Sequence, residues 1–310
     1  MKMEVNMIKR IISYFIVISF FFLLLGCSSE HHEKVKIGLL MSSLNNPYFT
    51  SLKAGAELEA KKEGYSLLVS NSQNDANREL PRAKKLIGKG IKVLLLNAVS
   101  IKSSTAVINY ANKHNVKVIA IDRALPDHDV IANISSDNYR GGELAGEYIK
   151  QRLRGSGIIL DMRGAPNTVV TQDRTNGLLS AIKGTNLKVL FSKDAGENQI
   201  KGIAIVKEEL QSNPEISAIF AHNDQIALGV AYYLQKHHKG NITVIGFDGT
   251  HEAMMAIQSG KISATIKQKP HKMGELGVKA AIDVLNGKKV SRSIVVPVHI
   301  ITTNMLAIAS

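Results

Sequence analysis

Thr243-Val244-Ile245-Gly246-Phe247-Asp248 carries the clearest signal of the fold class in this sequence. It is apolar from Val244 to Phe247 and ends in an acidic side chain. A strand with one face in water alternates apolar and polar residues, whereas a strand buried on both faces does not. The stretch therefore predicts an inner strand of a parallel sheet that helices cover on both sides.

The same apolar pattern recurs along most of the chain. The predicted strands are Val35–Met41, Ser66–Val69, Val93–Leu96, Val116–Ile121, Ile158–Leu160, Lys188–Phe191, Ala218–Phe220, Thr243–Phe247 and Ser263–Ile266. The predicted helices between them are Pro47–Glu63, Gly142–Leu153, Thr175–Ile182, Gln199–Leu210, Gln225–Gln235 and Met273–Leu285. Alternation of this kind predicts an α/β protein built from βαβ units with right-handed crossovers.

The predicted strands are too many for one sheet, so we expect two lobes. The chain becomes polar around Ser135-Ser136-Asp137-Asn138, where we place a first crossing between lobes. Lys267-Gln268-Lys269-Pro270 indicates a second crossing because Pro270 breaks the strand, and Pro297 indicates a third. The expected domains are residues 35–136 with 269–297, and residues 137–268 with 298–310.

The N-terminal segment has the pattern of a secretory signal peptide. Lys9 and Arg10 precede an apolar run from Ile11 to Gly26, and Cys27, the one cysteine of the chain, follows it. The end of the run also resembles the bacterial lipobox, in which the cysteine becomes a lipid-modified N-terminus. We expect a signal peptide at residues 1–26, lipidation of Cys27 and a lipid-anchored linker at residues 27–34. The alternative is a membrane-spanning helix, but the run is shorter than the ~20 residues of a usual span.

Composition indicates a folded, globular chain with a basic surface. The 310 residues are 45% hydrophobic and carry a formal net charge of +13, of which residues 1–26 contribute +2 and the rest +11. Nucleic-acid binding would account for such an excess, but the lysines are scattered through the sequence rather than gathered in one segment. We therefore expect no nucleic-acid partner, and interpret the charge as a solvated surface that an anionic membrane or cell wall attracts.

Polar residues follow most of the predicted strands. Ligands bind outside the carboxyl ends of parallel strands, so these residues are the candidates for a site. They are Ser42–Asn46, Asn97, Asp122, Arg123, Asp161, Arg163, Asn223, Asp224, Asp248 and Gln268, with Tyr48 and Phe49 nearby. Carboxylates, amides, guanidinium groups and an aromatic face together suit a neutral polyol. The alternative is that Asx residues end strands because they favour turns and helix caps.

Several of these segments resemble the signatures of one family. They are Ser43–Phe49, Ile121-Asp122-Arg123, Ser136-Asp137-Asn138, Phe220–Gly229 and Val244–Thr250. Together they resemble ribose-binding-type periplasmic binding proteins, the type I solute-binding proteins of sugar ABC transporters. The resemblance extends over essentially the whole chain after Cys27. It implies two Rossmann-like lobes with parallel sheets, joined by three hinge crossings, that close on a sugar.

The resemblance also implies which residues contact the ligand. They are Asn46, Tyr48, Phe49, Asn97, Asp122 and Arg123 on the first lobe, Arg174, Asn223 and Asp248 on the second, and Gln268 at a crossing. Arg174 lies in Thr171–Gly177, which matches the arginine-containing helix start of the family. Judged without the resemblance, Arg174 would be an ordinary arginine on a helix surface.

One residue departs from the family pattern. Ribose binders have an aromatic side chain just before the helix that starts here at Ile200-Lys201-Gly202, and this chain has Glu197-Asn198-Gln199. Glu197 would then replace the aromatic ring that stacks on the sugar, and the hydroxyl of Tyr48 adds a second polar group. This interpretation predicts a ligand other than plain ribose. The alternative is that Glu197 is a first-turn helix acid that points to water, favoured by the helix dipole.

Other motifs do not indicate catalysis or a cofactor. His31-His32 and His237-His238 are adjacent pairs whose side chains diverge, without a carboxylate cluster in the sequence pattern, so we expect no metal site. Gly88-Lys89-Gly90 lacks the Lys-Ser/Thr ending of a phosphate loop. We expect no cofactor and no enzymatic activity. A hydrolase or phosphorylase on the same fold is the enzyme alternative, and a bound nucleoside that turned over would support it.

The sequence thus predicts a lipid-anchored substrate-binding protein of an ABC importer. Its expected partners are a monosaccharide, the ABC permease and the membrane through its lipid, and we expect a monomer on the outer face of the cell membrane. In a Gram-negative cell that location is the periplasm. A sugar sensor that presents its closed form to a membrane histidine kinase or chemoreceptor would have the same pocket. A transcriptional repressor would need an N-terminal helix-turn-helix where this chain has the signal-peptide pattern.

Overall fold

The computed structural model describes residues 35–126, 128–165 and 168–309. The predicted signal peptide, Cys27 and the linker to residue 34 lie outside the described residues. From residue 35 onward the chain forms one compact unit. Within the described part of the chain, the helices are all too short or too polar to cross a membrane.

Two six-stranded sheets form the centre of this unit. Sheet A is parallel throughout. Its strands, in spatial order, are β11 (Ser293–Val296), β5 (Asn133–Ser136), β4 (Lys117–Ile121), β3 (Val93–Leu96), β1 (Lys36–Met41) and β2 (Ser66–Asn71). Sheet B is parallel except for one edge strand, β12, which runs antiparallel to β10. Its strands are β12 (His299–Thr302), β10 (Ala264–Lys267), β9 (Thr243–Asp248), β8 (Ile216–Ala221), β6 (Ser156–Met162) and β7 (Asn186–Phe191).

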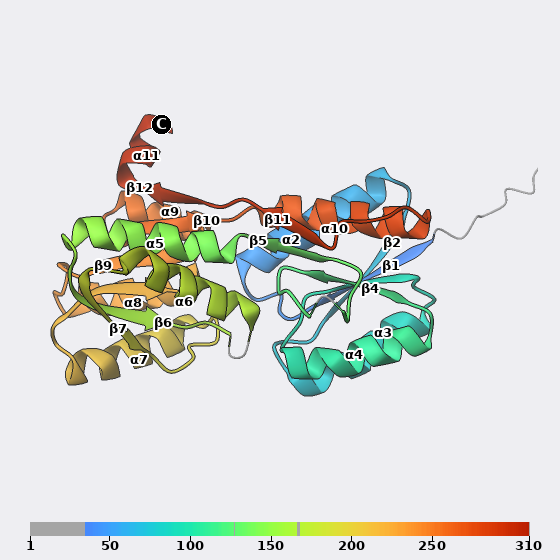
Figure 1. Cartoon of the computed structure of the whole chain (residues 1–310), viewed down its shortest axis with the longest axis horizontal. Helices are drawn as coiled ribbons and strands as arrows, with labels where there is room; N and C mark the ends of the chain where they lie inside the picture. Colours follow the sequence, from blue (N-terminus) through green and yellow to red (C-terminus); the bar gives the residue numbers. More distant parts are fainter. Residues whose placement is uncertain (1–34, 127, 166–167, 310) are drawn as a thin grey trace, which may run out of the picture. The chain divides into compact units, whose positions relative to one another are not determined.

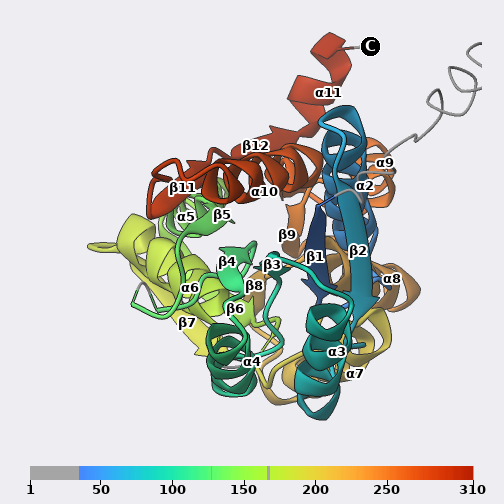
Figure 2. The same ribbon diagram turned by 90° about the vertical axis from the view of Figure 1, so that its right-hand side faces the viewer.

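Helices cover both faces of each sheet, as the apolar strands require (Figure 1, Figure 2). Around sheet A, α2 (Pro47–Lys62) and α10 (Pro270–Leu285) share one core, while α3 (Ala76–Gly88) and α4 (Ile101–Lys113) share the other. Around sheet B, α5 (Asn138–Arg152) and α6 (Val169–Ile182) cover one face. The other face is covered by α7 (Gln199–Ser212), α8 (Asp224–Lys236) and α9 (His251–Gln258), and α11 (Thr303–Ala309) ends the described chain. Each sheet therefore has its own pair of apolar cores and forms a lobe, named here lobe A and lobe B.

The chain passes between the lobes three times. After β5 of sheet A it enters α5, which packs on α6 in lobe B. After β10 of sheet B it enters α10, which packs on α2 in lobe A. Between β11 and β12 it crosses again, over Pro297 and Val298. The two-lobe α/β fold predicted from the sequence is confirmed.

The paired helices of each lobe approach closely because glycine lies where they meet. A Cβ atom added at Gly142 of α5 would collide with the carbonyl oxygen of Arg174 on α6. A Cβ atom at Gly55 of α2 would likewise collide with the carbonyl oxygen of His271 on α10. Close approach of α5 and α6 sets the position of Arg174.

Several element boundaries differ from those predicted. Helix α6 begins at Val169 rather than Thr175, because Thr168 caps it: the Thr168 side chain accepts a hydrogen bond from the backbone N–H of Thr171. Helix α5 begins at Asn138 rather than Gly142, with Asp137 as its cap. Strands β5, β11 and β12 have four residues each and were not among the predicted strands. Short strands at or near a sheet edge carry too little apolar pattern to be recognised.

Candidate binding site

A pocket lies where the carboxyl ends of the strands of both lobes meet. It is lined by ten of the eleven ligand-contact residues predicted from the sequence: Asn46, Tyr48, Phe49, Asp122, Arg123, Arg174, Glu197, Asn223, Asp248 and Gln268. The eleventh, Asn97, lies behind the pocket wall. The pocket also has lining residues that sequence reasoning missed, namely Gly164, Ala165, Thr168, Val170, Thr171 and His222.

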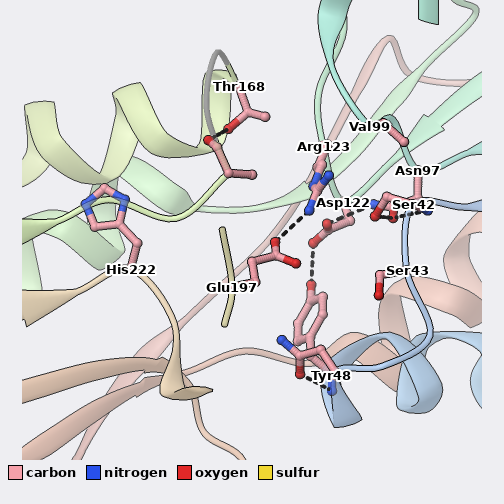
Figure 3. A network of polar contacts seen from close by, with 12 residues as sticks. Ser42, Ser43, Tyr48, Asn97, Val99, Asp122, Arg123, Thr168, Glu197 and His222 are labelled. Carbon is pink, nitrogen blue, oxygen red and sulfur yellow. Dashed lines mark hydrogen bonds and ion pairs between the residues drawn. The ribbon is translucent and has the colours of Figure 1, made fainter. Parts of the chain in front are cut away.

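On lobe A, a chain of buried hydrogen bonds holds Asp122 in place (Figure 3). The hydroxyl of Tyr48 donates to Asp122 Oδ1 at 2.6 Å, and Asn97 Nδ2 donates to Asp122 Oδ2 at 3.0 Å. Asn97 Oδ1 accepts in turn from the backbone N–H of Ser42 at 3.0 Å and from the Ser42 hydroxyl at 2.5 Å. Asn97 is therefore a supporting residue that orients Asp122 from behind.

Arg123 extends this wall with a fixed guanidinium group. Its Nη1 donates to the carbonyl oxygen of Ala98 at 2.8 Å, and its guanidinium carbon lies 5.6 Å from the centre of the Phe49 ring. Its Nη2 donates to Glu197 Oε1 of lobe B at 2.6 Å. Burial alone would lower the pKa of Arg123, but Glu197 and Asp122 outweigh that effect and raise it. Arg123 therefore stays charged.

On lobe B, Arg174 points into the site although it lies within α6. It is 6% exposed. Its Nε donates to Asn138 Oδ1 at 2.9 Å, Nη1 donates to the carbonyl oxygen of His222, and the guanidinium group stacks on the Phe247 ring at 3.5 Å. The alternative of an ordinary surface arginine is wrong. The close packing of α5 on α6 turns this side chain inward.

Asp248 is the acidic group of lobe B. Gln268 Nε2 donates to its Oδ1 at 2.7 Å, and Asn46 Nδ2 from lobe A approaches its Oδ2 at 3.5 Å. Behind Asp248 lies a second buried acid, Asp224, which accepts from the backbone N–H of Thr250 at 2.7 Å and from its hydroxyl at 3.0 Å. Asp224 supports the wall and does not line the pocket.

Burial dominates the electrostatics of the pocket acids. It raises the pKa of Asp122, against the opposing effect of Arg123 and the Tyr48 hydrogen bond. It raises the pKa of Asp248 well above its usual value, and the neighbouring Asp224 adds to this. The pKa of Asp224 is raised to about 6, again mainly by burial. Asp122 and Asp248 also both have positive φ angles, 68° and 129°. Such backbone is uncommon outside glycine and gathers at functional sites.

Glu197 lines the pocket from lobe B. It precedes α7 in a loop, before the N-cap residue Asn198, and its side chain is 15% exposed. The alternative of a first-turn helix acid that points to water is therefore wrong. Helix α7 starts at Gln199, after Glu197, because Asn198 caps it. The Asn198 side chain accepts a hydrogen bond from the backbone N–H of Lys201.

Helix capping and pocket lining coincide at two amide side chains. Asn46 Oδ1 accepts from the backbone N–H of Tyr48 at 2.9 Å, and Asn223 Oδ1 accepts from that of Ile226 at 2.9 Å. Both residues are N-caps and both line the pocket. The capping explanation and the site explanation are therefore compatible, because a cap fixes the amide nitrogen beside the pocket.

Two strand-end residues on β6 and its following loop do not line the pocket. Asp161 is fully buried, accepts from the Thr175 hydroxyl at 2.6 Å and contacts His222 Nε2 at 2.7 Å. Arg163 is partly exposed, and its Nε lies 3.7 Å from Asp194 Oδ1. His222 directly follows β8, so its place at the carboxyl end of a strand is the signal in the sequence that indicates a lining residue.

Side chains of both lobes line the pocket between them. Among the described residues, no group of three or more histidine, cysteine, aspartate or glutamate side chains is placed to hold a metal ion. The arrangement consists of hydrogen-bond acceptors and cationic donors around an aromatic ring. It can orient a polar ligand with hydroxyl groups.

This fold and this pocket define a two-lobe solute-binding protein. The chain belongs to the periplasmic binding protein domain family, whose model matches residues 37–289. It is 38% identical over 263 residues to the ribose import binding protein RbsB of Escherichia coli (strain K12), covering 85% of this chain and 89% of that protein. It is 35% identical over 305 residues to the ribose import binding protein RbsB of Bacillus subtilis (strain 168), covering 95% of this chain and 99% of that protein.

A solved structure supports the same assignment. An ABC transporter solute binding protein from Mycobacterium smegmatis with bound glycerol superposes with a TM-score of 0.85 at 26% identity, over 89% of this chain and 96% of that one. The predicted resemblance to ribose-binding-type periplasmic binding proteins is confirmed. The family makes this chain a binding protein rather than an enzyme, and implies an extracytoplasmic location.

Proposed function

We propose that the protein is the substrate-binding component of an ABC importer and binds a monosaccharide, ribose or a related pentose or hexose. The observation that carries the proposal is the pocket between the lobes, where buried acids face guanidinium groups beside the Phe49 ring. Such a set accepts hydrogen bonds from vicinal hydroxyls and packs against C–H groups. The names of the E. coli and B. subtilis relatives, both ribose import binding proteins, support the choice of ligand class.

The proposed mechanism is capture by closure of the two lobes. Residues of both lobes line the pocket, so separation of the lobes would open it to a ligand. A ligand that contacts Asp122 on lobe A and Asp248 on lobe B at once binds the closed form better than the open form, and so stabilises closure. The three connections between the sheets are the proposed hinge. The proposed domains are residues 35–136 with 269–297 and residues 137–268 with 298–310.

The proposed ligand contacts are Asn46, Tyr48, Phe49, Asp122, Arg123, Arg174, Glu197, Asn223, Asp248 and Gln268, with Asn97 in support. The most direct experiment is a thermal-shift screen of pentoses and hexoses against the chain from residue 28 onward. A ligand that binds only the folded state raises the melting temperature by mass action. We expect at least one sugar to raise it by several degrees. A panel in which every pentose and hexose leaves the melting temperature unchanged would contradict the proposal.

We further propose that the protein is a monomer on the outer face of the cell membrane, anchored through lipid on Cys27. The support is the sequence pattern of residues 1–27. Mass spectrometry of the protein extracted from the membrane fraction should show a chain that starts at Cys27 and carries added acyl mass. A chain that starts elsewhere, or a Cys27 without acyl mass, would contradict the lipid anchor.

A further inference from the structure

The loop between β7 and α7 holds Glu197 over the pocket in a conformation that is unfavourable for its residue type. The backbone N–H of Ala195 donates to the carbonyl oxygen of Arg163 at 2.9 Å, and that of Gly196 donates to the carbonyl oxygen of Gly164 at 3.2 Å. Glu197 follows with a φ of 58°. A large L-residue rarely adopts this left-handed backbone, and when it does the cause is often functional. The loop therefore maintains a strained residue whose side chain faces the site.

The two carboxylate oxygens of Glu197 are in different situations (Figure 3). Oε1 accepts from Arg123 Nη2 at 2.6 Å, across the boundary between the lobes. Oε2 is buried and has no hydrogen-bond partner among the described residues. A buried carboxylate oxygen without a donor is costly, because it has lost water and gained nothing in exchange. None of the residues that the structure describes supplies a donor to this oxygen.

Several donors of the pocket side chains are directed to other acceptors. The Tyr48 hydroxyl donates to Asp122, and the guanidinium of Arg174 donates to Asn138 and to the carbonyl oxygen of His222. Asn46 Nδ2 is directed at Asp248. A molecule bound in the pocket is then the natural source of a donor for Glu197 Oε2.

We propose that Glu197 is a specificity-determining residue whose Oε2 accepts a hydrogen bond from the ligand. The ligand class is a monosaccharide with a hydroxyl or amino group on the face that the β7–α7 loop covers. A sugar without a donor at that position leaves the carboxylate oxygen unpaired and binds more weakly. This inference rests on the proposed function and adds the side of the sugar that the protein selects.

The competing explanation is purely mechanical. Glu197 and Arg123 belong to different lobes, so their ion pair stabilises closure whichever ligand is bound. A residue that acts only through closure changes the affinity for every ligand by the same factor. A residue that accepts a hydrogen bond from one ligand group changes the affinity only for ligands that carry this group. Selectivity, rather than affinity, therefore separates the two explanations.

The test combines variants of the protein with deletions in the ligand. The tightest-binding sugar of the thermal-shift screen and its single-deoxy derivatives are titrated calorimetrically against wild type, Glu197→Ala and Glu197→Gln. On wild type, removal of one particular hydroxyl should weaken binding about tenfold or more, because it deletes a hydrogen bond to a charged acceptor. On Glu197→Ala the same removal should cost no more than about twofold. Glu197→Gln should fall between, since a neutral acceptor forms a weaker bond.

Glu208→Ala is the matched control. Glu208 is an exposed acid on α7 that pairs with Lys193 at 2.8 Å, and its loss should leave every affinity and every ratio unchanged. Melting curves of each variant establish that it is folded, and Glu197→Gln keeps the test open if Glu197→Ala is unstable. If every deoxy sugar loses the same factor on wild type and on both Glu197 variants, the selectivity role is overturned while sugar binding stands. If wild type binds no sugar, the proposed function and this inference both fail.

Discussion

The two walls of the pocket are built in different ways. On lobe A, Asp122 has both oxygens engaged, by Tyr48 and Asn97, and the Asn97 amide is itself held by Ser42. On lobe B, the described partners of the Asp248 side chain are Gln268 at 2.7 Å and Asn46 at 3.5 Å, and the buried Asp224 behind it raises its pKa further. Both carboxylate oxygens of Asp122 are paired within lobe A, whereas the carboxylate oxygens of Asp248 can still accept further hydrogen bonds.

This difference suggests that the two lobes have different roles in ligand binding. Groups that are already paired and buried keep one geometry, which suits an initial docking surface. Groups with free acceptors gain most when the ligand arrives, so their contacts favour the closed form. Lobe A would therefore orient the sugar, and lobe B would provide most of the additional stabilisation on closure. Substitutions on each of the two walls test this difference.

Asp248→Ala should weaken sugar binding about a hundredfold or more and cost less stability than the matched change on lobe A. The free acceptors of Asp248 suit two sugar hydroxyls, and two hydrogen bonds of about 1.5 kcal/mol each account for that loss of affinity. The change leaves the Gln268 amide without its buried acceptor, but it also removes a buried acid beside Asp224, so the melting temperature should fall by less than in Asp122→Ala. Calorimetric titration and thermal melting measure the two quantities.

Asp122→Ala is the matched change on lobe A. It should weaken binding and also lower the melting temperature, because the Tyr48 hydroxyl and the Asn97 amide lose their buried acceptor, at about 1–3 kcal/mol for each group left unpaired. If the two alanine variants lose equal stability, the two walls do not differ as described.

Gly142→Ala should destabilise lobe B by about 3 kcal/mol and also weaken sugar binding. The added methyl group meets the backbone of Arg174, so α5 and α6 must separate and the Arg174 guanidinium must shift. Overpacking of this kind costs about 1–3 kcal/mol, at the upper end where the obstacle is backbone. Gly88→Ala is the control, since Gly88 ends α3 with open space around it. Chemical denaturation of both variants checks the prediction, and equal stability would contradict it.

Tyr48→Phe should lower the stability of lobe A by about 1–2 kcal/mol. The change removes the hydroxyl that donates to Asp122 at 2.6 Å and leaves the ring, which packs edge to face against Phe49, in place. The melting temperature should fall by a few degrees. Tyr232→Phe, on the exposed side of α8, should leave it unchanged. A Tyr48→Phe protein as stable as wild type would mean that the lobe A network is not what holds Asp122.

Asp248→Asn should stabilise the ligand-free protein more at pH 7 than at pH 4. Burial and Asp224 raise the folded-state pKa of Asp248, while Asp122 and Glu197 add to this and Arg174 opposes it. Above about pH 4 the folded protein then holds a proton that the unfolded chain has released, so stability falls as pH rises through that window. Asparagine does not titrate, so the variant avoids this loss. Melting temperatures of both proteins from pH 4 to 7 give the difference, and a constant difference would contradict the prediction.

The match between predicted and observed structure is best where the chain is buried on both faces. The strand predicted at Val93–Leu96 is found with the same bounds, because four consecutive aliphatic residues allow little else. Strand β5, Asn-Ile-Ser-Ser, has only one apolar residue and owes its place to pairing with β4 and β11. The sequence of β5 itself does not indicate that β4 and β11 would be its neighbours.

The residues of the candidate site were also predictable from the sequence only in part. Asp122 and Asp248 could be located from the sequence, because the carboxyl ends of parallel strands must gather at one edge. Asn97 also follows a strand, yet it supports Asp122 from behind the wall, and the sequence pattern cannot distinguish these two roles. His222, at the end of β8, was available to the same reasoning and was overlooked.

The α/β class, the two-lobe division and the set of strand-end side chains follow from the sequence, since these depend on local patterns of burial and on the direction of parallel strands. The inward turn of Arg174 follows only from the fold, because it depends on how closely α5 packs against α6. The fold likewise places Glu197 opposite Arg123 across the pocket rather than in water. Both outcomes arise from contacts between segments that are distant in the chain, and no local pattern encodes them.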